Sequence, residues 1–137
     1  MCREICDLLV RSIAESCNKD HHNDPEILES WLANKTIENI RYWIQNNRTY
    51  CAKLRSGEIV GVLQVNSENK ILLNYVDPNY TDKGIGTNLL RKLENEIGSG
   101  KEIFVESTET AKPFYLKKGF TQREIQTNNL SKIIPLV

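Results

Sequence analysis

The sequence predicts a single α/β domain in which helices flank a mixed, mostly antiparallel central sheet. Three observations lead to this prediction. Apolar residues recur at helical spacing in the N-terminal part of the chain, and strand-like runs follow. Helical and strand-like segments then alternate. No repeat or linker interrupts the 137 residues, so residues 1–137 are expected to form one domain around one core.

The N-terminal part is expected to consist of three helices. Apolar side chains recur at helical spacing over residues 3–17. Asp24 and Pro25 are typical of a helix start, because the Asp side chain accepts a free amide hydrogen and proline lacks an amide that would need a partner. Thr36 is expected to cap the third helix, which carries Ile37, Ile40 and Ile44 on one face.

Strand-like patterns begin after the third helix, and Pro78 is expected to end the central strand because proline cannot donate to a ladder. The order of elements is a three-strand meander, a helix, a strand, a short helix and a final hairpin. The expected strands cover residues 49–54, 58–65, 70–76, 102–105, 120–126 and 130–137, and the expected helices cover residues 84–97 and 110–118.

Composition excludes several classes of protein. Eighteen basic residues balance eighteen acidic ones, so no charge pattern indicates a nucleic-acid or membrane-surface partner. No apolar run approaches the ~20 residues of a membrane span, and the N-terminus does not resemble a signal peptide, so the cytoplasm is the expected location. The four cysteines form no CxxC pair and are expected to be reduced thiols. Cys17, His21 and His22 do not match a zinc pattern, and no metal is expected.

The segment from Val76 to Leu90 carries the main chemical signal. A strand ends there, and a glycine-containing loop opens a helix whose first amides have no partner within the helix. Gly84 and Gly86 would let a phosphate approach the backbone, and Lys83 and Thr87 would add a charge and a hydroxyl. The segment therefore predicts an anion site, with a pyrophosphate as the expected ligand.

Two common phosphate-binding motifs do not fit this segment. A P-loop has Lys and then Ser or Thr after its last glycine, whereas Thr87 follows Gly86 directly. A dinucleotide-binding loop has a third glycine at the position that Leu89 occupies. Both nucleotide-binding classes are therefore disfavoured.

The letters VDPNYTDKGIGTNLL resemble the acyl-CoA-binding motif of the GCN5-related N-acetyltransferases (GNAT), V-x-P-x-x-R-G-x-G-I-G-x-x-L-L. The resemblance implies a GNAT-type fold and acetyl-CoA as co-substrate. Thr81 and Asp82 stand where the motif has Arg and Gly, a variant that resembles one subgroup of the family. The implied pantetheine contacts are Tyr75 and Val76, and the implied pyrophosphate contacts are Thr81, Asp82, Lys83, Gly84, Ile85, Gly86 and Thr87.

A second block, from Ala111 to Phe120, resembles the family's A-x-x-F-Y-x-x-x-G-F segment. The resemblance places Tyr115 near the CoA sulfur, where a phenol can donate a proton to the leaving thiolate. Glu106, at the end of the preceding strand, is the leading candidate for the base, with a solvated carboxylate as the alternative. The Val76 amide is expected to polarise the thioester carbonyl.

The resemblance implies transfer of an acetyl group to a primary amine of an unidentified small molecule or protein. The alternatives are a non-catalytic CoA-binding sensor or interaction module, and a protein with a different acyl donor or none. The family's usual first strand is expected to be absent, since helical spacing starts near Met1. A missing edge strand leaves both a monomer and a homodimer open. His21 and His22 lie in the region where the family builds its acceptor site.

Overall fold

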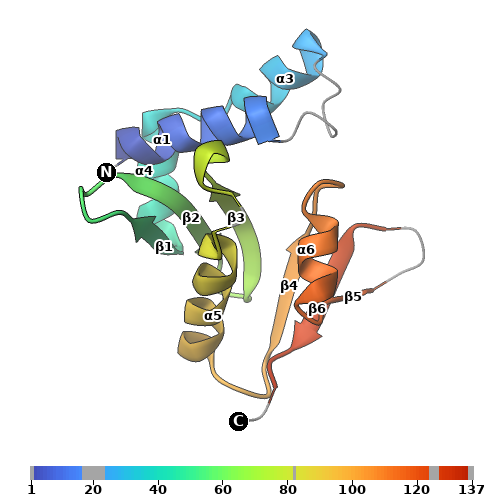
Figure 1. Ribbon diagram of the computed structural model, residues 1–137. Helices are drawn as coiled ribbons and strands as arrows, with labels where there is room; N and C mark the ends of the chain where they lie inside the picture. The colour runs from blue at the N-terminus through green and yellow to red at the C-terminus, as the bar shows by residue number, and fades with distance from the viewer. Residues whose placement is uncertain (1, 17–23, 82, 124–126, 136–137) are drawn as a thin grey trace.

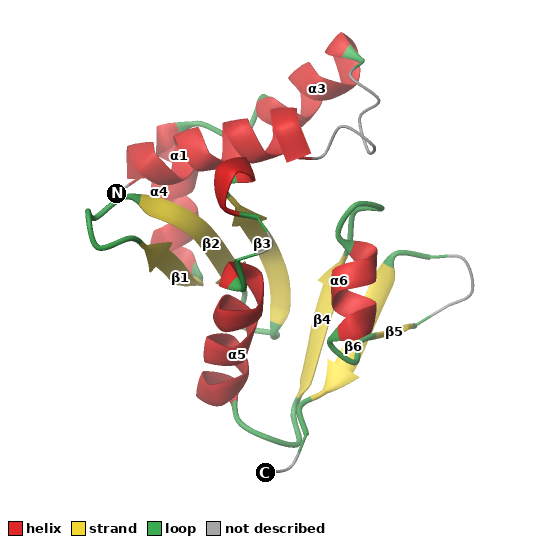
Figure 2. Ribbon diagram, in the orientation of Figure 1, coloured by secondary structure: helices red, strands yellow, loops and turns green. Residues whose placement is uncertain are grey.

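The computed structural model describes residues 2–16, 24–81, 83–123 and 127–135. Six strands form one sheet in the order β1-β2-β3-β4-β6-β5, with helices on both faces (Figures 1 and 2). In chain order the elements are α1 (Cys2–Arg11), η1 (Ser12–Ser16), α3 (Pro25–Leu32), α4 (Ile37–Asn46), β1 (Arg48–Lys53), β2 (Ile59–Val65), β3 (Lys70–Val76), η2 (Pro78–Tyr80), α5 (Ile85–Ile97), β4 (Glu102–Glu106), α6 (Lys112–Lys117), β5 (Thr121–Gln122) and β6 (Asn129–Ile133). The predicted class is confirmed.

The helix starts follow the local sequence. The Asp24 side chain accepts a hydrogen bond from the Glu26 amide at the start of α3. The Thr36 side chain accepts one from the Asn39 amide at the start of α4. Each cap satisfies an amide that the helix itself leaves without a partner, so both predicted starts are confirmed.

Four of the five strand pairings are antiparallel, and β3 pairs with β4 in parallel. The sheet separates two hydrophobic cores. The core beneath α5 and α6 includes Leu63, Leu93, Ile103, Phe120 and Leu130. The core beneath α1 and α4 includes Ile5, Leu8, Leu9, Ile40 and Val62.

A register shift in β3 distributes its side chains between these two cores. Ile71 lies opposite Val65 and Leu73 lies opposite Gln64, so Leu72 has no partner across the ladder. An extra residue of this kind reverses the alternation of side chains. Ile71 therefore packs in the α5–α6 core, whereas Leu73 packs in the α1–α4 core.

Three expected elements differ from the structure. The helix expected over residues 3–17 ends as α1 at Arg11 and continues as a π-helical turn. The strand expected over 120–126 is the two-residue β5, and the one expected over 130–137 ends at Ile133; residues 124–126 and 136–137 lie outside the described residues. The first strand among the described residues is β1, which follows α4.

Gly61 allows α5 to lie close to the sheet. A Cβ at this position would lie 2.8 Å from Cγ2 of Ile85 and 3.1 Å from Cδ1 of Leu89. We expect Gly61→Val to lower the free energy of unfolding by about 1–3 kcal/mol because the added methyl groups overpack this contact. Urea denaturation measures the loss, and Gly61→Ala should lose less. An unchanged midpoint for Gly61→Val would contradict this account of the packing.

Candidate active site

The sheet opens between β3 and β4. These two strands pair only at Lys70 with Phe104 and at Ile71 with Val105, near the start of β3 and the end of β4. Beyond that point they diverge, as Figure 1 shows. A cleft of about 400 Å³ lies at the divergence, bordered by the ends of β3 and β4 and by the start of α5 and α6. We call this the donor cleft.

The end of β3 turns backbone groups toward the donor cleft. The Asp77 amide donates to the Val60 carbonyl at 2.8 Å, on the β2 side of the strand. Because backbone groups alternate in direction along a strand, the amides of Asn74 and Val76 face away from β2. The Val76 carbonyl accepts a hydrogen bond from the Ser12 hydroxyl at 3.0 Å. Tyr75 also lines the cleft, while its side chain packs against the α1–α4 core.

The N-terminal end of α5 borders the same cleft. Gly84 is its N-cap, with φ of 79°, a left-handed conformation that favours glycine, and no side chain caps the helix. The first bond within the helix runs from the Asn88 amide to the Gly84 carbonyl. The amides of residues 85–87 therefore have no acceptor within the helix, and the positive end of the helix dipole lies there.

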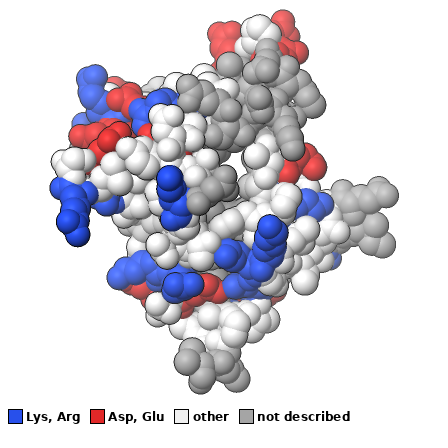
Figure 3. Space-filling view, in the orientation of Figure 1, with Lys and Arg blue, Asp and Glu red and all other residues white. Residues whose placement is uncertain are grey.

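The other predicted loop residues are distributed around this helix end. Thr81 and Gly86 line the donor cleft, while Lys83 is exposed and Thr87 half-buried at the same helix end. Ile85 instead packs against the α5–α6 core. Asp82 lies outside the described residues, as do Cys17, His21 and His22. Figure 3 shows Lys and Arg side chains over α5 and α6 on the face that carries this turn.

Tyr115 of α6 lies at the inner wall of the cleft. Its side chain is 3% exposed, and its ring contacts Phe114 and Phe120 edge to face. Asn74 Nδ2 donates a hydrogen bond to the Tyr115 hydroxyl oxygen at 2.9 Å. Because Asn74 occupies an acceptor position of that oxygen, the phenol hydrogen is left to be donated.

Burial raises the pKa of Tyr115 to about 12, and the hydrogen bond from Asn74 opposes that rise. Burial acts in this direction because the phenolate loses its hydration. The phenol is therefore fully protonated at neutral pH. This pKa lies above the ordinary value of about 10 on which the sequence-based expectation rested, so the phenol is a weaker acid than expected.

This pKa predicts a loss of stability in alkali. Below pH 10 both the folded and the unfolded chain keep the Tyr115 proton. Between pH 10 and 12 only the folded chain keeps it. The free energy of unfolding therefore falls as the pH rises through this range. Tyr115 should account for a loss of at most about 3 kcal/mol across this range. Urea denaturation of the wild type and Tyr115→Phe at several pH values measures it, since lysine titration is common to both. Parallel pH profiles for the two proteins would contradict the shift.

Glu106 ends β4 and lines the donor cleft together with Tyr115. Its side chain is 70% exposed, and its Oε2 lies 3.9 Å from the Lys70 Nζ. The structure thus brings the two predicted catalytic residues to one cleft, with the phenol buried and the carboxylate in contact with solvent. An exposed carboxylate can exchange protons directly with water.

Three residues that support the site were not predicted from the sequence. Asn74 interrupts the apolar run of β3, and a buried polar side chain in such a run requires a partner, which was the available signal. The Arg11 guanidinium pairs with the buried Asp77 carboxylate at 2.8 Å and, with Ser12, ties the end of α1 to the end of β3. Nothing in the local sequence around Arg11 or Ser12 indicates this contact.

The described residues form neither a metal-binding cluster nor a membrane-spanning helix. In that part of the chain no three His, Cys, Asp or Glu side chains group as they would around a metal ion. None of the described helices combines the length and apolar character needed to cross a membrane.

Comparison with known proteins identifies the family. The family model described as "Acetyltransferase (GNAT) domain" matches residues 8–133. An uncharacterized N-acetyltransferase of Escherichia coli K12, YafP, is 25% identical over 120 residues, which cover 86% of this chain and 73% of YafP. This match confirms the resemblance to one subgroup of the family.

Solved structures share the fold. A GCN5-related N-acetyltransferase of Rhodopseudomonas palustris aligns with a TM-score of 0.79 at 23% identity, over 97% of this chain and 89% of that one. The PaiA N-acetyltransferase of Thermoplasma acidophilum, solved in complex with coenzyme A, aligns with a TM-score of 0.75 at 20% identity, over 96% and 92%. With a matching family model over nearly its whole described length, this chain belongs to the GNAT acetyltransferase family, whose acyl donor is acetyl-CoA.

Proposed function

We propose that this chain transfers an acetyl group from acetyl-CoA to a primary amine of a small molecule or protein. One observation carries the proposal. A single cleft adjoins an uncapped helix end, the diverging end of a strand, a buried protonated phenol and an exposed carboxylate. These groups match the successive needs of pyrophosphate binding, pantetheine binding and acyl transfer.

Each group has a proposed role. The amides of residues 85–87 bind the pyrophosphate, with Thr81, Lys83 and Thr87 beside it, and the backbone of β3 binds the pantetheine. The Val76 amide polarises the thioester carbonyl as the amine nitrogen bonds to the acetyl carbon and the carbon–sulfur bond breaks. Glu106 accepts the proton that the amine must lose.

The pKa of Tyr115 defines how it assists the leaving sulfur. An ordinary thiol has a pKa of about 8.5, so a phenol with a pKa of about 12 remains the weaker acid. Complete transfer of its proton to the thiolate is uphill by roughly 5 kcal/mol. We therefore assign Tyr115 the role of hydrogen-bond donor to the sulfur as negative charge develops, with solvent supplying the final proton.

Calorimetric titration with acetyl-CoA, followed by measurement of free thiol release with a panel of amines, tests the proposal. We expect saturable binding and amine-dependent release of CoA. Binding without turnover on any amine would favour the CoA-binding sensor or interaction module. Absence of binding at millimolar acetyl-CoA would reject both functions. Acetylated product identified by mass spectrometry distinguishes transfer from simple thioester hydrolysis.

The cellular setting belongs to the same proposal. The thiols of Cys6 and Cys51 are free in the structure, which supports the reducing environment of the cytoplasm.

β1 pairs with β2 alone among the described strands, so its other edge is available to a second subunit. Light scattering coupled to size-exclusion chromatography distinguishes the proposed monomer from the homodimer.

A further inference from the structure

A second pocket, of about 430 Å³, adjoins the donor cleft. Val105 and Glu106 line both cavities, so the two meet at the end of β4. We call it the charged pocket, because its other lining residues include two cations and a second carboxylate. These other residues are Glu68, Lys70, Phe104, Arg123, Asn129 and Leu130.

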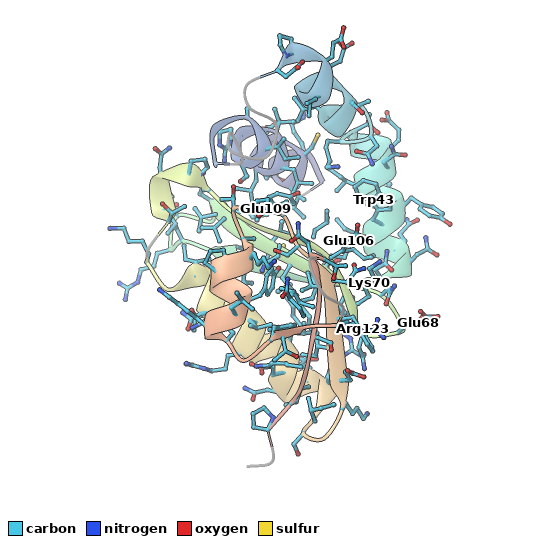
Figure 4. The ribbon with its side chains drawn as sticks, turned by 90° about the vertical axis from the view of Figure 1, so that its right-hand side faces the viewer. Trp43, Glu68, Lys70, Glu106, Glu109 and Arg123 are labelled. Carbon is cyan, nitrogen blue, oxygen red and sulfur yellow. The ribbon has the colours of Figure 1, made fainter. Side chains whose placement is uncertain are left out.

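The charged pocket lies on the face of the sheet opposite α5 and α6. Ile103 and Val105 pack in the α5–α6 core, so the alternating Phe104 and Glu106 face the other way. Figure 4 views the sheet from its β5–β6 edge and shows Glu106, Lys70, Arg123 and Glu68 near one another, below Trp43 of α4. An amine bound there would approach the donor cleft from the side that α5 and α6 leave open.

Strand register fixes the spacing of the charges. Glu106 lies opposite Asn129 on β6, and the Arg123 amide donates to the Asn129 carbonyl at 2.9 Å. Glu106 and Arg123 therefore lie level with each other on either side of β6. Their backbones are separated by two strand spacings, roughly 10 Å. Glu68 lies two residues before Lys70, on the side away from Glu106, since β3 and β4 run in parallel.

The Arg123 guanidinium is held in place, and the described residues bring no anion against it. It lies 4.9 Å from the centre of the Phe104 ring, and no carboxylate in the described part of the chain lies within the 4.0 Å of an ion pair. Lys70 Nζ is 3.9 Å from Glu106 Oε2, too far for a hydrogen bond. A stacked guanidinium presents a planar pair of donors that matches a carboxylate.

We propose that the charged pocket is the acceptor site and selects amines that carry a carboxylate, an inference that rests on the proposed acetyl transfer. The amine lies beside Glu106, where the pocket meets the donor cleft. The carboxylate lies against Arg123, with Lys70 between the two ends adding positive potential. Lys70 and Arg123 both line the pocket beyond Glu106, so a second ammonium group bound against them would be repelled.

A series of acceptors tests the charge and the spacing together. Glycine, β-alanine, 4-aminobutyrate and 5-aminopentanoate are compared with alkylamines and terminal diamines of matching length, at saturating acetyl-CoA. We expect kcat/KM for the best amino acid to exceed that of its matched alkylamine at least tenfold, mainly through KM. Equal values, or a preference for diamines, would overturn the inference while leaving acetyl transfer itself intact.

Variants of Arg123 test whether a preference for amino acids over other amines arises in the charged pocket. Arg123→Gln should abolish the advantage of the amino acid, Arg123→Lys should retain part of it, and Arg123→Glu should reverse it in favour of the diamine. Arg55→Gln removes an exposed charge from the β1–β2 turn and should leave the preference unchanged. A preference that persists in Arg123→Glu would refute the role of Arg123.

A binding measurement separates this inference from the proposed catalysis. Calorimetric titration of 4-aminobutyrate and 5-aminopentanoate into protein saturated with CoA requires no turnover. We expect binding that is weakened at least tenfold by Arg123→Gln. Such binding without acetylation would refute the proposed function but retain the pocket's ligand class, whereas acetylation of amines without such binding would refute the ligand class alone.

Discussion

Tyr115→Phe is expected to lower kcat by roughly a hundredfold, the lower end of the effect of removing a hydrogen-bond donor to charge that develops in the transition state. The substitution removes the hydroxyl that lies 2.9 Å from Asn74 Nδ2 in the donor cleft and keeps the buried ring. Because the hydroxyl acts on sulfur only as charge develops there, the dissociation constant of acetyl-CoA should change little. Steady-state kinetics and calorimetry measure the two quantities separately.

Tyr50→Phe is a matched control for this prediction. It also removes a phenol hydroxyl, but one whose 3.5 Å contact is to Glu96 on the outer surface of α5. Its kcat should equal that of the wild type. Tyr115→Phe also leaves Asn74 without its partner, at a cost of about 1–3 kcal/mol in the free energy of unfolding. Activity must therefore be compared where urea denaturation shows both proteins folded. Equal kcat for Tyr115→Phe and wild type would remove Tyr115 from the mechanism.

Gly86→Val is expected to weaken acetyl-CoA binding by about tenfold to a hundredfold, corresponding to about 1–3 kcal/mol of overpacking. A Cβ on Gly86 would lie 3.4 Å from Cε1 of Phe114 and 3.9 Å from Cγ2 of Val76. The two further methyl groups of valine would enter the donor cleft, where the uncapped amides of α5 meet the end of β3. Calorimetry with acetyl-CoA and with CoA measures the loss.

Asn88→Val provides the control for Gly86→Val. It places the same β-branched side chain in α5 at an exposed position, after the first bond within the helix has formed. Neither substitution lowers helix propensity, because valine ranks with asparagine and above glycine, and only Gly86→Val fills the cleft. Affinity should fall only for Gly86→Val. Similar affinities for both variants would show that the α5 end is not where the donor binds.

Local sequence was enough to predict most elements of the fold. Examples are the caps at Asp24 and Thr36, the strand end before Pro78 and the glycine that opens α5. Each of these signals acts on residues only a few positions away from it. The hairpin at the C-terminus was less well predicted, because β5 pairs only with β6 at two positions. How far an edge strand continues depends on its partner rather than on its own apolar pattern.

By itself, the sequence determined the α/β class, the family and the loop that opens α5, because each depends on spacing within one short segment. Tertiary structure alone decided which groups meet. Asn74 and Tyr115 are 41 positions apart, Arg11 and Asp77 are 66 apart, and Arg123 reaches Phe104 through the register of β4, β6 and β5. A polar side chain that becomes buried requires a partner, but the local sequence does not show which residue the partner is. The partner follows only when strand order and register bring distant segments within a few ångströms.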